Sequence, residues 1–207
     1  MKKLLIGCAL ALFLSIGVTP LSVEAATTQS HTVVSGDTLW KIALKYQVGV
    51  TELININTQL QNPDLIYPGM KISIPSQAPG RAFEKEVIRL VNVERAKYGL
   101  KPLAENWELS RVARYKSNDM ADRRYFSHTS PTYGSPFTMM KNFGIRYTSA
   151  GENIAMGQKS AAEVMNGWMN SPGHRKNILN SSFTQIGVGY GVNSSGTPYW
   201  TQMFIRP

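Results

Sequence analysis

The segment SQAPG, from Ser76 to Gly80, divides the chain into two parts with different sequence patterns. Proline and glycine suit the interior of neither a helix nor a strand, so this segment is predicted to be a linker. From Ser76 to Ala82 the chain can reach roughly 23 Å when fully extended, which keeps the two parts close together. We therefore expect two domains, in residues 31–75 and 83–206, joined by a linker at residues 76–82.

The N-terminal residues 1–25 have the pattern of a secretory signal peptide. Two lysines precede an apolar run from Leu4 to Val18 that is short for a membrane span, and small residues around Ala25 offer a cleavage site. The alternative is a lipoprotein signal, because LIGC ends at Cys8. We expect cleavage after Ala25, no transmembrane anchor after cleavage, and a secreted, extracellular protein.

Charge and cysteine content restrict the partners of the secreted chain. Cys8 is the only cysteine, so the secreted chain would fold without disulfides. Removing Lys2, Lys3 and Glu24 from 22 basic and 13 acidic residues leaves 20 and 12, a net charge of +8. Such a charge favours anionic partners such as anionic wall polymers, or serves solubility alone. Nucleic acid is not an expected partner, because the sequence has no dense Lys/Arg run and no recognition motif.

The first domain has the pattern strand, helix, helix, strand. Residue composition predicts a strand at His31–Val34, with His31 at its exposed edge, and alternation predicts another at Lys71–Ile74. Apolar residues recur at helical spacing from Leu39 to Tyr46, and we expect Asp37 to cap this helix. A second helix is expected to follow with Thr51 as its N-cap.

The motifs SGDTLWKIA and IYPGMKISIP resemble those of the LysM domain, over essentially its full length. The resemblance implies a small βααβ fold that binds N-acetylglucosamine-containing glycans, chiefly peptidoglycan or chitin. It places the glycan groove between two loops, with residues Ser35, Gly36, Asp37, Thr38 and Leu39 in one and Asn62, Pro63, Ile66 and Tyr67 in the other. Backbone amides of the glycine turn could contact an acetamido group, while Leu39 and Ile66 pack on the sugar. Alternatively, these loops only cap helices and hold the small core.

The second domain has mainly helical periodicity, followed by a strand-rich tail. Apolar stripes in FEKEVIRLVNVERAKYGL, WELSRVARYKSNDMADRRYF, SPFTMMKNFGI and KSAAEVMNGWMNSPG predict four helices. QIGVGYGVN and PYWTQMFI predict two strands around a turn, and a further strand is expected near Gly151–Ala155. The fold class is therefore α+β, with helices packed on a small, mostly antiparallel sheet.

Four motifs in this domain follow one another in a familiar order: YFSHTSP, AGENIA, WMNSPGHRKNIL, and FTQIGVGY followed by YWTQMF. They resemble the CAP superfamily of cysteine-rich secretory proteins, venom antigen 5 and plant pathogenesis-related proteins, in particular its cysteine-free bacterial branch. The resemblance implies an α-β-α sandwich. It leaves the activity open, because the family's activities include sterol or lipid binding and protein interaction.

The resemblance carries over the family's cleft only in part. His128 matches the first histidine of the cleft, and Glu152 matches the glutamate of the GEN motif. Ser171 stands where the family has a second glutamate, and Tyr199 stands where it has a second histidine. His174 lies in a Pro-Gly stretch that is expected to be a turn after the fourth helix, and the bacterial branch commonly has this histidine. We expect it to enter the same cleft.

His128, Glu152 and His174 allow three interpretations. They could hold zinc with an open fourth position. Glu152 could act as general base with a histidine as acid, although no nucleophile is evident. They could also form a polar network that holds loops or recognises a ligand. We predict that the three side chains lie within roughly 8 Å of one another. Glu163 is a substitute carboxylate, but it lies about 140° around the helix from Trp168 and is expected to face water.

The sequence thus predicts a secreted, cell-wall-associated protein whose LysM module binds N-acetylglucosamine glycans of peptidoglycan. Its CAP domain is expected to have a binding or structural activity. The alternative is a metal-dependent or metal-free hydrolase that acts on peptidoglycan or protein. No cofactor is required by the first prediction, and a divalent metal such as zinc is the one that the cleft could hold. A vegetative wall and a spore envelope are both compatible with the sequence.

Overall fold

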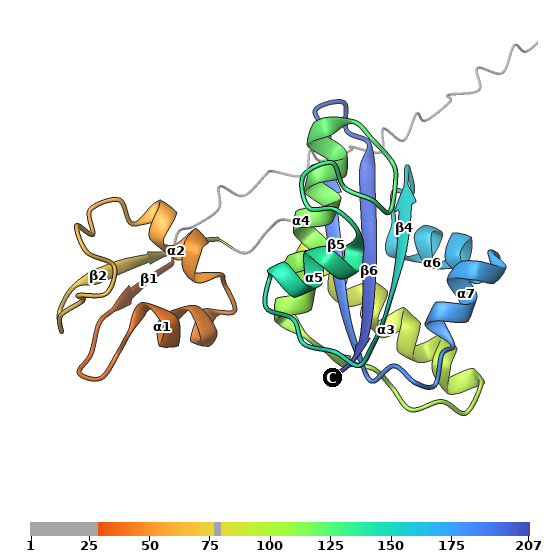
Figure 1. The fold of residues 1–207 in the computed structure, drawn as a ribbon, viewed down its shortest axis with the longest axis horizontal. Helices are drawn as coiled ribbons and strands as arrows, with labels where there is room; N and C mark the ends of the chain where they lie inside the picture. The colour runs from red at the N-terminus through yellow and green to blue at the C-terminus, as the bar shows by residue number, and fades with distance from the viewer. Residues whose placement is uncertain (1–28, 77–79) are drawn as a thin grey trace, which may run out of the picture.

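The computed structural model describes residues 29–76 and 80–207, which form two domains (Figure 1). The predicted signal peptide lies outside the described residues, as does the middle of the predicted linker. Within the described ranges, no helix combines the length and apolar character needed to cross a membrane.

The first domain has the predicted order of elements: β1 (Gln29–Thr32), α1 (Leu39–Tyr46), α2 (Val50–Ile56) and β2 (Lys71–Ile74). The two strands pair antiparallel, with His31 opposite Ile72. Both helices pack on this pair around one small core, made of Val33, Leu39, Ile42, Ala43, Leu53, Ile72 and Ile74.

The predicted N-caps of both helices are wrong. The N-cap of α1 is Thr38, whose hydroxyl accepts the Lys41 N–H at 3.1 Å, and the N-cap of α2 is Gly49. Asp37 instead accepts the Val34 N–H at 2.9 Å and lies 2.8 Å from His31 Nε2. This contact draws His31 inward, so it is 8% exposed rather than at an exposed strand edge.

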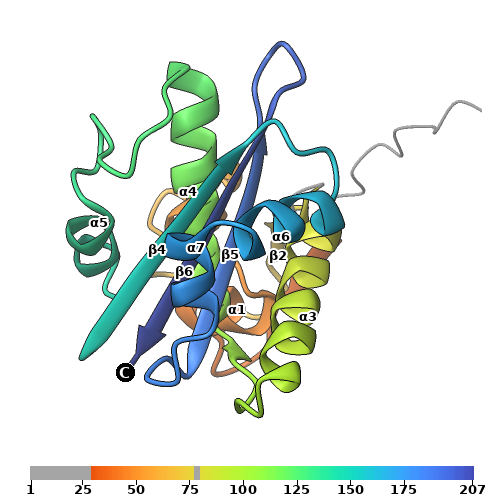
Figure 2. The same ribbon diagram turned by 90° about the vertical axis from the view of Figure 1, so that its right-hand side faces the viewer.

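The second domain is an α-β-α sandwich, as predicted. Its sheet has the order β3-β5-β6-β4, antiparallel except for the short parallel pair β3–β5. The strands are β3 (Ala104–Glu105), β4 (Ser149–Met156), β5 (Gln185–Val192) and β6 (Pro198–Arg206). The helices are α3 (Arg81–Lys97), α4 (Trp107–Arg123), α5 (Pro136–Asn142), α6 (Ala161–Met169) and α7 (Pro172–Ile178). Helices α4 and α5 cover one face of the sheet, and α3, α6 and α7 cover the other (Figure 2).

Alternating glycines in QIGVGYGV let α4 lie directly on β5. A Cβ atom at Gly187 would lie 2.3 Å from the backbone of Leu109, and one at Gly189 would lie 2.2 Å from the backbone of Ala113. Side chains at these positions would therefore push α4 off the sheet. The close approach fixes α4, from which the loop carrying His128 emerges.

The stretch after α6 is a helix and not the predicted turn. Helix α7 begins at Pro172 directly after its N-cap, Ser171. Proline is favoured at the first helical position because its missing N–H would have no partner there in any case. His174 therefore lies in the first turn of α7, which fixes its backbone more tightly than a loop would.

Candidate functional site

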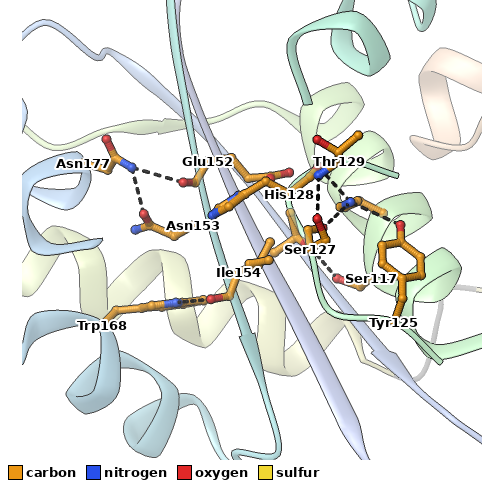
Figure 3. A network of polar contacts seen from close by, with 12 residues as sticks. Ser117, Tyr125, Ser127, His128, Thr129, Glu152, Asn153, Ile154, Trp168 and Asn177 are labelled. Atoms are coloured by element: carbon orange, nitrogen blue, oxygen red, sulfur yellow. Dashed lines mark hydrogen bonds and ion pairs between the residues drawn. The ribbon is translucent and has the colours of Figure 1, made fainter. Parts of the chain in front are cut away.

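His128 and Glu152 form the centre of the candidate site (Figure 3). His128 comes from the loop after α4, and Glu152 comes from β4, the edge strand of the sheet. His128 Nδ1 lies 2.7 Å from Glu152 Oε1. The histidine side chain is 53% exposed and the glutamate side chain only 2%, so the imidazole is open to solvent while the carboxyl group is enclosed.

The carboxyl group of Glu152 is only half satisfied. Its Oε2 atom is buried and has no hydrogen-bond partner among the described residues. Burial raises the pKa of Glu152, against the opposing hydrogen bond from His128 and the positive charge of Lys116. A buried acceptor without a partner costs free energy, so this oxygen is suited to receive a proton donor from a ligand or a water molecule.

His174 approaches the same region from α7. Its carbonyl oxygen accepts a hydrogen bond of 3.1 Å from Asn153 Nδ2, which ties α7 to β4. Burial lowers the pKa of His174, and the charge of His128 lowers it further. Convergence of all three side chains within roughly 8 Å stays a prediction.

Side chains of α6 and α7 also cover the outer edge of β4. Asn177 Nδ2 donates to the Glu152 carbonyl at 3.1 Å, and Trp168 Nε1 donates to the Ile154 carbonyl at 3.2 Å. An edge strand with free carbonyls could pair with another chain, and these contacts prevent that at both positions. They also fix the backbone on either side of the Glu152 side chain.

A groove of about 280 Å³ lies beside His174. It is lined by Phe126, Ile154, Ala155, Met156, Gln158, Val164, Gly167, Trp168, Ser171 and His174. Most of this lining is apolar, and its polar side chains are those of Gln158, Ser171 and His174. Tyr199, which stands where relatives have a histidine, is 4% exposed and packs in the apolar cluster with Ile154.

Glu163 does not belong to this site. Its side chain is exposed, and its carboxylate accepts the Lys159 N–H at 2.9 Å. Its own N–H donates to the Ser160 hydroxyl at 3.1 Å, so the residue helps to cap α6. The prediction that Glu163 faces water is confirmed.

The described residues do not fit a metal site as they stand. A zinc ion in a hydrolase needs three protein ligands and an open fourth position. Within residues 29–76 and 80–207, no three His, Cys, Asp or Glu side chains are grouped so that they could hold a metal ion.

The residues beneath the His128 loop were not among the site residues predicted from the sequence. Lys116 is fully buried, and its Nζ atom donates to the carbonyls of Ser127 and His128 at 2.7 and 3.0 Å. Asp119 accepts from three hydroxyl groups of the same segment, those of Tyr125, Ser130 and Thr132. One signal was available: Lys116 follows Ala113 by three residues and precedes Met120 by four, which places a lysine on the apolar stripe of α4.

The two predicted glycan loops of the first domain meet at their bases. The Gly69 N–H donates to the Val33 carbonyl at 2.9 Å, and the Val33 N–H donates to the Met70 carbonyl at 2.8 Å. Tyr67 is 57% exposed beside this contact. Leu39 is only 4% exposed and belongs to the core, so its side chain is not available to a glycan.

The remaining predicted glycan residues divide into structural and exposed groups. Asp37 and Thr38 are engaged in the local hydrogen bonds described above, and the Asn62 carboxamide accepts the Asp64 N–H at 3.0 Å. Ile66 is partly buried against the core. Ser35 and Gly36 are exposed, and Pro63 is half-buried. Gly36 has a φ of +86°, which favours glycine at this turn.

The fold and the cleft place the second domain among α-β-α sandwich domains with a histidine–glutamate pair at the sheet edge. A model of the CAP, or cysteine-rich secretory protein, family matches residues 88–204, more than half of the chain, and a LysM domain model matches residues 31–75. The chain belongs to the cysteine-rich secretory protein family and carries a LysM domain.

Three known proteins show the extent of the similarity. The uncharacterized protein YkwD of Bacillus subtilis is 58% identical over 137 residues, covering 65% of this chain and 52% of that protein. An extracellular protein with an SCP domain from Bacillus anthracis has a similar structure, with a TM-score of 0.56, 34% identity and coverage of 68% and 47% of the two chains. SpoIVD-associated factor A of Bacillus subtilis is 64% identical over 47 residues, 23% of this chain and 12% of that protein. The chain thus spans about half the length of the first two.

Proposed function

We propose that this is a secreted, cell-wall-associated protein that binds N-acetylglucosamine glycans of peptidoglycan through its LysM domain. The observation that carries the proposal is the junction of the two loops at Val33 and Gly69, with exposed apolar side chains around it. Val34, Leu65 and Tyr67 are each more than half exposed. Exposed apolar side chains on a small domain favour a ligand, and the apolar faces of sugar rings suit them.

A sedimentation assay with purified peptidoglycan tests this proposal. Tyr67→Ala should weaken the affinity by about fivefold, or roughly 1 kcal/mol, because it removes an exposed aromatic ring beside the two loops. Phe137→Ala is the matched control, since Phe137 is an aromatic residue of the CAP domain with 44% exposure. Equal binding by the wild type and a variant lacking residues 31–75 would show that the LysM domain is not the glycan-binding part.

For the CAP domain, we propose ligand recognition in the cleft between His128 and His174. An open imidazole, an enclosed carboxyl group with one free oxygen, and an adjoining apolar groove suit a ligand with both a polar and an apolar part. Anionic wall polymers are a second class of partner that the net positive charge favours. A spore envelope and a vegetative wall are both settings to examine.

The hydrogen bond between His128 and Glu152 supports a second candidate function, a hydrolase acting on peptidoglycan or protein. A carboxyl group with a raised pKa beside an imidazole is a combination used in general acid–base catalysis. No serine or cysteine side chain bonds to either imidazole within the described residues, so water would be the nucleophile.

Wall digestion separates the two functions of the CAP domain. If the cleft hydrolyses peptidoglycan, purified walls should lose turbidity with the wild type, and both Glu152→Gln and His174→Ala should abolish the loss. If the cleft only binds, turbidity stays constant with all three proteins while they sediment equally with the walls. The assay is run with and without added zinc.

A further inference from the structure

Lys116 is a buried charge directly beneath the loop that carries His128. It projects from α4, and its relative exposure is 0%. Its Nζ atom lies within hydrogen-bond distance of three oxygen atoms: the Ser127 carbonyl at 2.7 Å, the His128 carbonyl at 3.0 Å and the Tyr125 hydroxyl at 3.2 Å. Few lysines are fully buried, and those that are need partners for their charge.

These three contacts match the charged form of lysine. The Tyr125 hydroxyl gives its own proton to Asp119 Oδ2 at 2.5 Å, so its oxygen is free to accept from Lys116. The two carbonyl oxygens can only accept. An ammonium group has three N–H donors and no acceptor, whereas a neutral amine has two donors. Three acceptors around one Nζ atom therefore fit an ammonium ion.

Two carboxyl groups balance this charge. Burial lowers the pKa of Lys116, while the negative charges of Glu152 and Asp119 raise it. Reciprocally, the charge of Lys116 is one of the influences that lower the pKa of Glu152 against the effect of burial. Geometry links Lys116 to Glu152 through one residue: the His128 carbonyl accepts from Lys116 Nζ at 3.0 Å, and His128 Nδ1 lies 2.7 Å from Glu152 Oε1. Asp119 already accepts three hydroxyl hydrogen bonds, whereas Glu152 has one oxygen without a partner among the described residues. Of the two carboxyl groups, that of Glu152 therefore has the greater need of a nearby positive charge.

We propose that Lys116 is the resident cation of the CAP cleft. Its three hydrogen bonds position the loop that carries His128, and its charge balances Glu152, as a bound metal ion would in a metal-dependent cleft. The proposal explains why the described residues hold an enclosed carboxylate without a three-ligand metal set. It concerns the same cleft as the proposed function but does not depend on the ligand of that cleft.

The protonation state of Lys116 can be measured in the wild-type protein by nitrogen-15 NMR of its Nζ atom. The signal is assigned from its loss in Lys116→Arg, which keeps the charge. We expect an ammonium signal at pH 7 whose protons exchange slowly with water because all three are hydrogen-bonded. A neutral amine signal at this pH would overturn the proposal, and this measurement needs no variant that removes the charge.

Zinc binding, measured by calorimetry on the purified chain, tests the role of the charge. Wild type and Glu152→Gln should bind zinc equally, because Lys116 disfavours a second cation near Glu152. Lys116→Met should bind zinc about tenfold more tightly than the wild type, a gain of about 1.4 kcal/mol. The double variant that carries both Lys116→Met and Glu152→Gln should lose this gain. Lys85→Met removes an exposed lysine and is the matched control.

Every outcome of the zinc-binding measurements supports or overturns the proposed role of Lys116. Tight zinc binding by the wild type that Glu152→Gln abolishes would overturn the proposal, as would a folded Lys116→Met protein with unchanged zinc affinity. If Lys116→Met does not fold, the comparison of wild type with Glu152→Gln and the Nζ signal still decide. Failure of the peptidoglycan assays, by contrast, would leave these outcomes unaffected.

Discussion

Asp119 shows how a single carboxylate positions the candidate site. It accepts hydrogen bonds from Ser130 at 2.7 Å and from Thr132 and Tyr125 at 2.5 Å each. Burial favours a higher pKa, but these hydroxyl groups outweigh it and hold the pKa of Asp119 below its usual 3.8. The loop between Tyr125 and Thr132 includes His128, so the position of that histidine depends on Asp119.

Asp119→Asn should therefore destabilise the protein in a pH-dependent way. At pH 7 we expect a loss of about 2–3 kcal/mol in the free energy of unfolding, typical of hydrogen bonds to a charged group. Because the folded-state pKa is lowered, this stabilisation is present above pH 3.8 and is lost as the pH falls through the folded value. Urea denaturation at pH 7 and pH 3 measures both values. Asp122→Asn, at an exposed position in α4, should change neither.

His174 provides a test of the distance between the two imidazoles. The charge of His128 contributes to the lowered pKa of His174. His128→Ala should therefore raise the pKa of His174, but not to its usual 6.5, because burial, the larger cause, remains. Proton–carbon NMR titration measures it, with the signals of His31 in the LysM domain as an unaffected reference. No change at His174 would mean that the two rings lie too far apart to form one site.

At the scale of residues, sequence motifs were sufficient to predict the pair of polar side chains in the cleft, but not the residues that hold the His128 loop in place. His128 and Glu152 lie in short motifs that can be read from the sequence. Lys116 and Asp119 could not be assigned to the site, because their partners are backbone carbonyls and hydroxyls that only the folded loop brings to them. The burial of His31 was missed for the same reason, since it depends on contacts with Asp37 and Tyr46.

At the scale of elements, the packing of α4 on β5 depends on glycine. Gly189→Ala should destabilise the protein by about 1–3 kcal/mol or more, because an added methyl group overpacks the interface with the backbone of Ala113. Gly167→Ala is the matched control: Gly167 lies within α6, and a Cβ atom there would have no atom within 4 Å. This control should instead stabilise by about 0.5–1 kcal/mol. Equal effects of the two variants in chemical denaturation would contradict the close-packing argument.

Elements with long periodicity were all predicted, whereas among the short ones β3 and α7 were missed. Helices α3 and α4 and the strands β5 and β6 follow from their apolar patterns, and a further strand was expected near Gly151–Ala155, which lies within β4. Helix α7 has only seven residues, and its Pro-Gly start is equally typical of a turn. The helical interpretation needed the N-cap position of Ser171 before Pro172, a signal that is present in the sequence but is short.

At the scale of the whole molecule, the two domains meet through a small polar contact. Glu52 of α2 accepts hydrogen bonds from Arg111 Nε at 2.6 Å and from the Tyr115 hydroxyl at 2.8 Å, both on α4. A cleft of about 260 Å³ lies between the domains beside this contact. In Figure 2, the LysM domain lies behind the CAP domain while β4, α6 and α7 face the viewer. The elements that line the groove of the CAP domain therefore lie on the side of that domain away from the LysM domain.

This arrangement has a consequence for the proposed function. If the LysM domain holds a glycan strand, the elements that line the CAP cleft lie on the far side of the CAP domain from that strand. The CAP ligand would then come from another strand, or from the medium beyond the wall. The consequence holds only while Glu52 and Arg111 keep the domains in contact, so the strength of this pair decides how freely the CAP domain can turn.

Reversing the charge of Glu52 should loosen the two domains. An exposed or half-buried ion pair contributes only about 0.2–1 kcal/mol, so Glu52→Arg should broaden the distribution of distances between the domains rather than separate them fully. The double variant Glu52→Arg with Arg111→Glu should restore a narrow distribution, because it re-forms the pair in reverse. Glu108→Arg, at an exposed position in α4, is the control for charge alone.

Electron spin resonance can measure these distances with spin labels on Thr58→Cys and Asn142→Cys, because the chain has no other cysteine outside the predicted signal peptide.

Lowering the pH should loosen the contact between the domains, as Glu52→Arg does. Burial favours a higher pKa for Glu52, but Arg111 and Tyr115 outweigh it and lower the pKa below its usual 4.5. The contact should persist at pH 4.5 and be lost as the pH falls through the lowered value. If, at pH 7, the wild-type protein and Glu52→Arg gave equally broad distance distributions, the domains would move independently. The CAP cleft could then reach the glycan held by its own LysM domain.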